Sequence, residues 1–285
     1  MIARPSRLVA DGFMFLEAPK WREDELWVSD VFAHEVHALS QSGRRARQFE
    51  VPNRPSGLGF LSDGALIVAS AKDRRLLRFD GKRLDEYADL SRYAAGWIND
   101  FAVDLQDRVY VGDFGYDFAG GETPKPTCLH RVDSDGSVHW VADGVEFPNG
   151  SAVIDDGRTL VVAETWACRI AAFDLDASGN LSNRRIFAEL GHRQPDGLCA
   201  DAEGALWVGI YNTGEFVRVE AGGRVTEVLQ FGGNGISCTL GGKTGRTLFV
   251  TVFLGSEVDL SAGKRNSAIF AVEVEVPCPA KGGRQ

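Results

Sequence analysis

Residues 196–209, DGLCADAEGALWVG, contain the pattern that decides the fold: a short apolar segment, a turn of acidic residues and glycine, and a second apolar segment. Two such segments joined by a short polar turn predict a pair of antiparallel strands. The same order of segments recurs along the chain, in copies that begin near residues 17, 56, 99, 149, 196 and 236. Successive copies start about 39–50 residues apart, which is the period of a propeller blade.

A third strand-like run follows each pair, as at residues 75–79, 169–173 and 216–219, and a more polar fourth run often follows it. The chain is therefore predicted to be all-β, a six-bladed β-propeller with four antiparallel strands per blade. Six blades occupy residues 1–285 as a single domain. Residues 7–10 are expected to add an outer strand beside residues 268–274, which would cover an open sheet edge.

Composition narrows the classes of partner. The chain has 40 acidic and 31 basic residues and a net charge of −9, which argues against nucleic acid or an anionic membrane surface as a partner. Neither a signal peptide nor an apolar stretch of the ~18 residues that span a bilayer is visible. The 5 cysteines lack metal-site spacing and are interpreted as free thiols of a cytoplasmic protein. No feature predicts an oligomeric state.

Polar residues stand at the start of several first strands, and these starts should meet at one mouth of a central channel. The residues are Glu17, Asn99, Asn149 and Asp196. Any one of them alone is interpreted more simply as part of a turn. Four oxygen-bearing side chains at the same phase of the repeat instead indicate a site for a hard divalent cation.

The same residues carry a family resemblance. Glu17-Ala18-Pro19-x-Trp21, Asn99-Asp100, Phe147-Pro148-Asn149-Gly150, Pro195-Asp196-Gly197-Leu198 and residues 169–187 together resemble the SMP-30/gluconolactonase/LRE-like family over nearly the whole chain. The resemblance implies a six-bladed propeller that hydrolyses lactones, typically sugar lactones, with one divalent metal ion. It implies Glu17, Asn149 and Asp196 as metal ligands, with Asn99 near both metal and substrate. Calcium is the favoured metal, and zinc, magnesium, manganese and iron are alternatives.

The chemistry of these side chains agrees with lactone hydrolysis. A divalent ion polarises the carbonyl group and stabilises the tetrahedral oxyanion. Asp196 would ligate the ion and accept a proton from the attacking water, the role that relatives suggest. Asn99 would orient the substrate or a water. The chain has no Gly-x-Ser-x-Gly motif, P-loop or Rossmann fingerprint, so the corresponding enzyme classes are not predicted.

Two positions depart from the family pattern. Relatives have a substrate-binding arginine two residues before the site asparagine, where this chain has Trp97, and Tyr116 stands where an acidic contact is expected. Aromatic side chains are expected either to line a flatter, less polar pocket or to pack between blades; they are Trp97, Phe114, Tyr116, Trp166 and Phe253. The predicted substrate is a small-molecule lactone less polar than gluconolactone. The alternatives are a propeller aryl-esterase or phosphotriesterase, and a non-enzymatic, metal-stabilised binding propeller.

Overall fold

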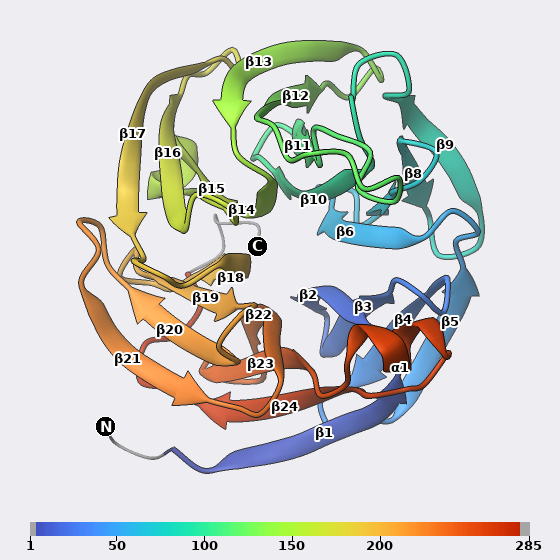
Figure 1. Cartoon of the computed structure of the whole chain (residues 1–285), viewed down its shortest axis with the longest axis vertical. Helices are drawn as coiled ribbons and strands as arrows, with labels where there is room; N and C mark the ends of the chain where they lie inside the picture. Colours follow the sequence, from blue (N-terminus) through green and yellow to red (C-terminus); the bar gives the residue numbers. More distant parts are fainter. Residues whose placement is uncertain (1–3, 280–285) are drawn as a thin grey trace.

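The computed structural model describes residues 4–279, and its strands form six antiparallel sheets of four strands arranged around a central axis (Figure 1). The predicted six-bladed β-propeller is therefore confirmed. We number the blades 1 (β2–β5), 2 (β6–β9), 3 (β10–β13), 4 (β14–β17), 5 (β18–β21) and 6 (β22–β24 with β1). The described residues also contain a 3₁₀ turn, η1 (Asp155–Gly157), and a short helix, α1 (Glu257–Ser261).

Each blade runs from an inner strand at the axis to an outer strand at the rim. The inner strands are β2 (Leu16–Arg22), β6 (Pro55–Phe60), β10 (Ile98–Val103), β14 (Pro148–Ile154), β18 (Pro195–Ala200) and β22 (Asn234–Gly241). The second strands are β3 (Glu25–Asp30), β7 (Leu66–Ser70), β11 (Val109–Asp113), β15 (Thr159–Glu164), β19 (Leu206–Ile210) and β23 (Thr247–Phe253). The third strands are β4 (Glu35–Ser40), β8 (Arg75–Phe79), β12 (Thr127–Val132), β16 (Arg169–Leu175), β20 (Glu215–Val219) and β24 (Ser267–Glu273). The outer strands are β5 (Arg45–Glu50), β9 (Leu84–Asp89), β13 (Val138–Val145), β17 (Leu181–Glu189), β21 (Val225–Gln230) and β1 (Ser6–Phe13).

The ring is closed within blade 6. Strand β1 pairs antiparallel with β24, with Leu8 opposite Phe270 and Phe13 opposite Ser267. The two strands lie side by side at the rim in Figure 1. The expected outer strand is therefore present, and it covers the edge of β24 that would otherwise expose unpaired backbone groups.

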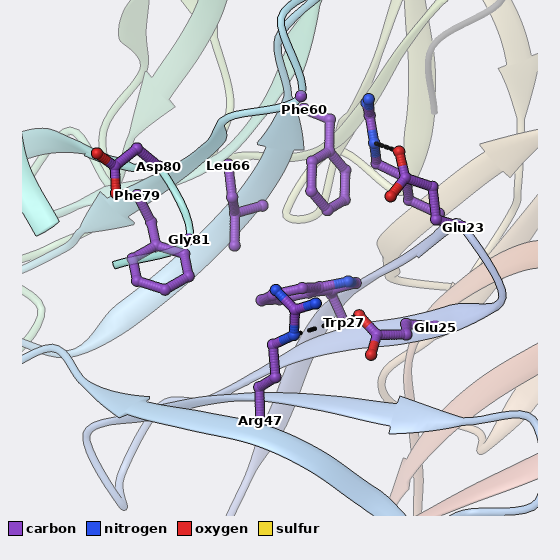
Figure 2. Close-up of a pocket in the computed structure, with 11 residues that line it drawn as sticks. Glu23, Glu25, Trp27, Arg47, Phe60, Leu66, Phe79, Asp80 and Gly81 are labelled. Carbon is purple, nitrogen blue, oxygen red and sulfur yellow. Dashed lines mark hydrogen bonds and ion pairs between the residues drawn. The ribbon is translucent and has the colours of Figure 1, made fainter. Parts of the chain in front are cut away.

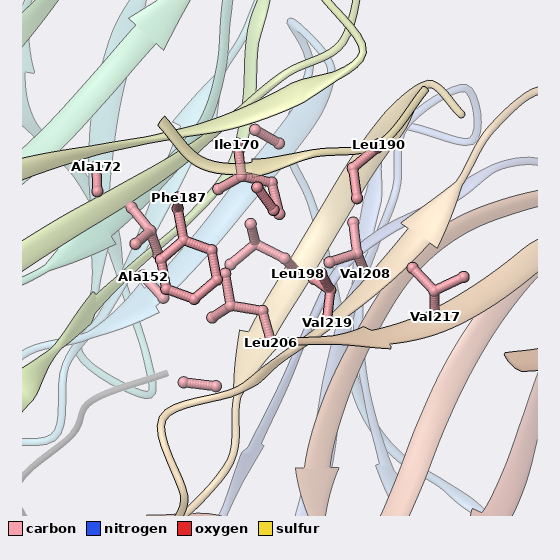
Figure 3. Packing of buried hydrophobic residues seen from close by; sticks show 14 of the residues in the cluster. Ala152, Ile170, Ala172, Phe187, Leu190, Leu198, Leu206, Val208, Val217 and Val219 are labelled. Atoms are coloured by element: carbon pink, nitrogen blue, oxygen red, sulfur yellow. The ribbon is translucent and has the colours of Figure 1, made fainter. Parts of the chain in front are cut away.

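The core lies between blades. Every residue of β18 is buried, whereas most of β5 is exposed, because an inner strand is covered by both neighbouring blades and an outer strand faces water. Figure 3 shows one such contact, in which Leu198 and Leu206 of blade 5 pack with Phe187 of blade 4. Burying an apolar side chain of this size contributes roughly 1.5–3 kcal/mol.

Gly150 allows two inner strands to approach each other closely. A Cβ atom on Gly150 would lie 2.5 Å from the Leu198 nitrogen and 2.6 Å from the Gly197 Cα. Real Cβ atoms do not come this near to backbone, so any larger residue would push β14 and β18 apart. Asn149 and Asp196, one residue before each of these glycines, are thereby held on adjacent strands.

Two further expectations concern the cysteines and the membrane. Cys128, Cys168, Cys199, Cys238 and Cys278 are all free, as predicted. Among residues 4–279, no helix has the length and apolar character needed to cross a bilayer.

His37 makes stability depend on pH. It is fully buried in β4 with its ring 5.2 Å from that of Phe13, and burial, with smaller effects from Arg45 and Arg265, lowers its pKa from 6.5 to about 4. The unfolded chain therefore binds more protons between these pH values, so stability present above pH 6.5 is lost as the pH falls toward 4.

Between pH 7 and pH 4.5, we expect the free energy of unfolding to fall by about 2–3 kcal/mol more in the parent protein than in His37→Gln. The reason is that one pKa unit corresponds to about 1.4 kcal/mol. Urea unfolding of the parent protein and the variant at pH 7 and pH 4.5 measures the difference. An equal loss of stability in both proteins would contradict the role of His37.

Candidate functional site

The strand register places the predicted site residues at one level of the propeller. In each blade the first paired residue of the inner strand lies opposite the last residue of the second strand, as with Leu16 and Asp30, or Pro195 and Ile210. The next residue of the inner strand then occupies the same position in every blade. These residues, in blade order, are Glu17, Ser56, Asn99, Asn149, Asp196 and Gly235. We call this end of the propeller axis the mouth.

The acidic side chains at the mouth repel one another. Burial raises the pKa of Glu17 well above its ordinary value, and the charges of Asp196 and Asp100 raise it further. Burial and Asp100 likewise raise the pKa of Asp196, while a hydrogen bond from Asn149 acts in the opposite direction. Three carboxyl groups thus share a poorly solvated region, and bringing a positive charge among them would stabilise their ionised forms.

The amide nitrogens of the two asparagines are held by hydrogen bonds to neighbouring groups. The Asn99 Nδ2 donates to the Pro148 carbonyl oxygen at 3.1 Å, and the Asn149 Nδ2 donates to the Thr165 hydroxyl at 3.4 Å. Thr165 in turn donates to the Pro195 carbonyl oxygen at 2.8 Å. Because each amide nitrogen is used by the neighbouring strand, the amide oxygen remains available as a ligand or acceptor.

These residues fit a divalent cation. The Asp196 Oδ1 is buried and has no hydrogen-bond partner among the described residues. A buried, unpaired carboxylate oxygen costs free energy unless it coordinates a cation. In the described part of the chain, no three histidine, cysteine, aspartate or glutamate side chains form a metal-binding cluster by themselves, so the asparagine oxygens would have to complete the set.

Lys20 and Asp100 are parts of this region that the predicted ligand set leaves out. Both are buried. Burial raises the pKa of Asp100, and the nearby charge of Lys20 offsets part of this increase. Lys20 lies in the same Glu-Ala-Pro-Lys-Trp phrase as Glu17, which was the available signal in the sequence. A lysine beside an acidic group reduces the local negative charge without itself serving as a ligand.

Acidic residues at the ends of second strands support loops at the mouth. The Asp30 Oδ2 accepts a hydrogen bond from the Met14 amide at 3.0 Å, and its Oδ1 accepts one from the Phe15 amide at 3.0 Å. Asp113 accepts from the Gly96 amide at 3.1 Å, and Glu164 pairs with Arg169 at 2.8 Å. All three are buried. These bonds occupy both oxygens of Asp30 and of Glu164, whereas the Asp113 Oδ2 has no hydrogen-bond partner among the described residues.

Aromatic side chains form a continuous band around part of the mouth. The rings of Phe114 and Phe147 stack at 4.6 Å, and Trp166 lies 4.9 Å from Phe147. The Trp166 Nε1 donates to the Tyr116 hydroxyl at 3.1 Å. Trp166 is 38% exposed, whereas Tyr116 is 4% exposed, so Tyr116 supports the band and Trp166 forms part of its open face.

Trp97 extends the band within blade 3, whereas Phe253 forms a separate contact at the boundary of blades 6 and 1. Trp97 lies 6.1 Å from Phe114, and Phe253 lies 5.3 Å from Phe15. The predicted aromatic residues thus gather at the mouth, although Phe253 is buried. Phe147 lies at the centre of the band. In the sequence it stands out only through the Phe-Pro-Asn-Gly phrase that contains Asn149. Its ring partners are Phe114, Tyr116, Phe118 and Trp166.

A hollow of 130 Å³ lies on the opposite face, between blades 1 and 2 (Figure 2). Trp27, Phe60 and Phe79 form its apolar walls, with Arg47 and Glu25 at its edge. It is bordered by the turns between first and second strands, at the far end of β2 and β6 from the mouth. None of the predicted site residues lines it.

Comparisons with known proteins identify relatives in sequence and in fold. The chain is 28% identical over 285 residues to pentonolactonase XacC of Haloferax volcanii, covering 94% of each chain. It is 26% identical over 258 residues to regucalcin of Xenopus laevis, covering 86% of this chain and 85% of that protein. The structure of a calcium-binding regucalcin from Agrobacterium tumefaciens superposes with a TM-score of 0.81 at 22% identity, covering 97% and 96% of the two chains, and so shares the fold.

The family profile described as the SMP-30/Gluconolactonase/LRE-like region matches residues 15–253. This range runs from the residue before β2 to the end of β23 and includes all four predicted site residues. The resemblance drawn from the sequence is confirmed. The chain belongs to the SMP-30/gluconolactonase/LRE-like family.

Proposed function

We propose that this chain is a metal-dependent lactonase whose site comprises Glu17, Asn99, Asn149 and Asp196. The observation that carries the proposal is the buried, unpartnered Asp196 Oδ1 among carboxyl and amide oxygens at the mouth. The family and the pentonolactonase relative support lactone hydrolysis as the reaction.

Glu17, Asn149 and Asp196 would hold one divalent cation, with Asn99 beside it. Calcium is favoured, because the set supplies oxygen ligands and a structural relative is described as calcium-binding. Zinc, magnesium, manganese and iron are the alternatives. When bound, the ion supplies Lewis acidity toward the lactone carbonyl oxygen.

The side chains of the chain divide the remaining work. Asp196 accepts a proton from the attacking water, since its carboxylate belongs to the proposed cation site and so lies beside the place where the carbonyl group would react. Asn99 orients the attacking water, which donates a hydrogen bond to its amide oxygen, because its Nδ2 is held by the Pro148 carbonyl group. Glu17 contributes negative charge that balances the cation. The buried setting excludes water and strengthens each of these interactions.

The aromatic band supports a substrate less polar than gluconolactone. Trp166, which Phe147 supports, offers exposed indole surface next to Thr165, the hydrogen-bond partner of Asn149, and few hydrogen-bond groups for sugar hydroxyls. The same band favours one alternative, an aryl-esterase or phosphotriesterase that uses the same ion. A non-enzymatic binding propeller is the other alternative.

A hydrolysis screen with a pH indicator tests the function. The substrates are glucono-δ-lactone, dihydrocoumarin, an alkyl γ-lactone, an aryl acetate and a neutral aryl phosphotriester, each with EDTA and after calcium is restored. We expect kcat/KM for dihydrocoumarin to exceed that for glucono-δ-lactone at least tenfold, and EDTA to abolish activity reversibly.

Each other result selects a different interpretation. Faster hydrolysis of glucono-δ-lactone contradicts the substrate class, and faster hydrolysis of the aryl ester or phosphotriester favours the related hydrolases. Absence of turnover with tightly bound metal favours the binding propeller.

A further inference from the structure

The residues two positions before the ring of site residues form a second ring, farther out at the mouth. Its members occupy equivalent positions because the register is the same in all six blades, and they are Phe15, Arg54, Trp97, Phe147, Gln194 and Gly233. Arg54 is the cationic member. It precedes Ser56 by the same two residues that separate Trp97 from Asn99.

The Arg54 guanidinium lies between two aromatic rings. Its Cζ is 4.4 Å from the centre of the Phe32 ring and 5.2 Å from that of Trp97. Contacts with two rings restrict the motion of the guanidinium and reduce the entropy that an incoming ligand would have to remove. The Arg54 backbone has a φ of +70°, a left-handed conformation that is unfavourable for a non-glycine residue.

The Arg54 backbone is nevertheless held in place. Its carbonyl oxygen accepts from the Ala71 amide at 2.8 Å, and its amide donates to the Val51 carbonyl oxygen at 3.2 Å. The conformation is therefore imposed by the contacts of the loop before β6, and it directs the side chain toward Trp97 of the next blade.

The charge of Arg54 has no ion-pair partner in the described part of the chain. Its Nε is buried without a hydrogen-bond acceptor, and within residues 4–279 no carboxylate forms an ion pair with it. Nearby Arg75 shows the contrast, because it pairs with Asp73, Glu86 and Asp89. The net charge of the chain is −9, yet among the described residues no carboxylate pairs with this cation beside the mouth.

Lys72 adds a second cation. Its Nζ is 5.7 Å from the Trp97 ring, its backbone amide donates to the Asn53 carbonyl oxygen at 3.0 Å, and its side chain has no ion pair among the described residues. Lys72 lies just after β7 and Arg54 just before β6. The first hairpin of blade 2 therefore brings both charges to the indole ring of Trp97.

We propose that Arg54 and Lys72, on the Trp97 ring, form a subsite for an acidic group of the substrate. The substrate would then be a lactone with a carboxylate at one end of an apolar or aromatic body. This inference rests on the proposed lactonase function. A carboxylate satisfies the unpaired guanidinium through paired N–H donors, while the body packs on the aromatic band toward Asn99. Blade 2 thus supplies a guanidinium, whereas blade 3 has Trp97 at the position where relatives have an arginine.

A pair of substrates that differ in one charge tests the subsite. The probes are dihydrocoumarin and a dihydrocoumarin that carries a carboxylate on its benzene ring. We expect Arg54→Met to reduce kcat/KM for the carboxylated lactone at least tenfold, mainly through KM, and for dihydrocoumarin less than twofold.

Two further variants and a control define the role of the charge. Arg54→Lys should retain part of the kcat/KM that Arg54→Met loses, and Lys72→Met should produce a smaller loss, again only for the carboxylated lactone. Lys243→Met, at an exposed cation on the opposite face, is the matched control and should change neither value.

Binding of the corresponding lactams separates this inference from the proposed function, since lactams resist hydrolysis. Calorimetry should show the carboxylated lactam binding at least tenfold more weakly to Arg54→Met than to the parent protein, even if no lactone is hydrolysed. Equal losses for charged and neutral probes, or unchanged binding of the carboxylated lactam, would overturn the subsite. Melting temperatures within a few degrees of the parent value establish that each variant is folded.

Discussion

Asp196→Asn is expected to reduce kcat for lactone hydrolysis by about 10³-fold, within the range that a general base contributes. The substitution keeps the shape of the side chain and one oxygen atom but removes the proton acceptor. Initial rates at saturating calcium measure the loss, and metal analysis of the same samples separates lost proton transfer from lost metal.

The matched control is Asp174→Asn. Asp174 belongs to β16, its side chain is 49% exposed, and it pairs with Arg185 at 2.6 Å. This control should retain the parent rate. Activity of Asp196→Asn within tenfold of the parent protein would remove Asp196 from the proposed mechanism.

Glu17→Gln is expected to weaken calcium binding on the order of 100-fold, because affinity at oxygen sites depends strongly on the number of charged ligands. In the parent protein, calcium at 100 times its Kd should stabilise the fold by about 2.7 kcal/mol, and the variant should lose most of this gain. Isothermal titration and thermal unfolding with and without calcium measure both effects.

Glu23→Gln provides the control for the change of charge. Glu23 lies in the turn after β2, on the opposite face, with its side chain 80% exposed. This variant should bind calcium as the parent does. An unchanged calcium affinity in Glu17→Gln would contradict the proposed ligand set.

The number of blades, the closing strand and the shared level of Glu17, Asn99, Asn149 and Asp196 could be predicted because a propeller repeats one local pattern. The phrases at Asn149 and Asp196 occupy the same phase, and the phase alone determines which end of the strand each residue occupies. Hydrophobic runs such as residues 205–209 likewise determine the second strand of a blade without reference to distant residues.

Contacts between blades could not be predicted in this way. Asp30 is an acidic residue at a strand end in the sequence, but its role depends on the backbone amides of Met14 and Phe15 across a bend. Arg54 and Trp97 are in different blades, and their contact depends on the left-handed backbone at Arg54. Local periodicity contains no information about which side chains meet across such a boundary.

The pairing of β1 with β24 has a consequence for the order of folding. Ser6 pairs with Val272, so one of the last strands to leave the ribosome completes a sheet with the first. The five blades from β2 to β21 can form as the chain is synthesised, whereas β1 must wait with unpaired backbone groups. Ring closure is therefore expected to be the slow step, because it joins the most distant segments. During that interval, the exposed edge of β1 is where a second nascent chain could pair and exchange strands.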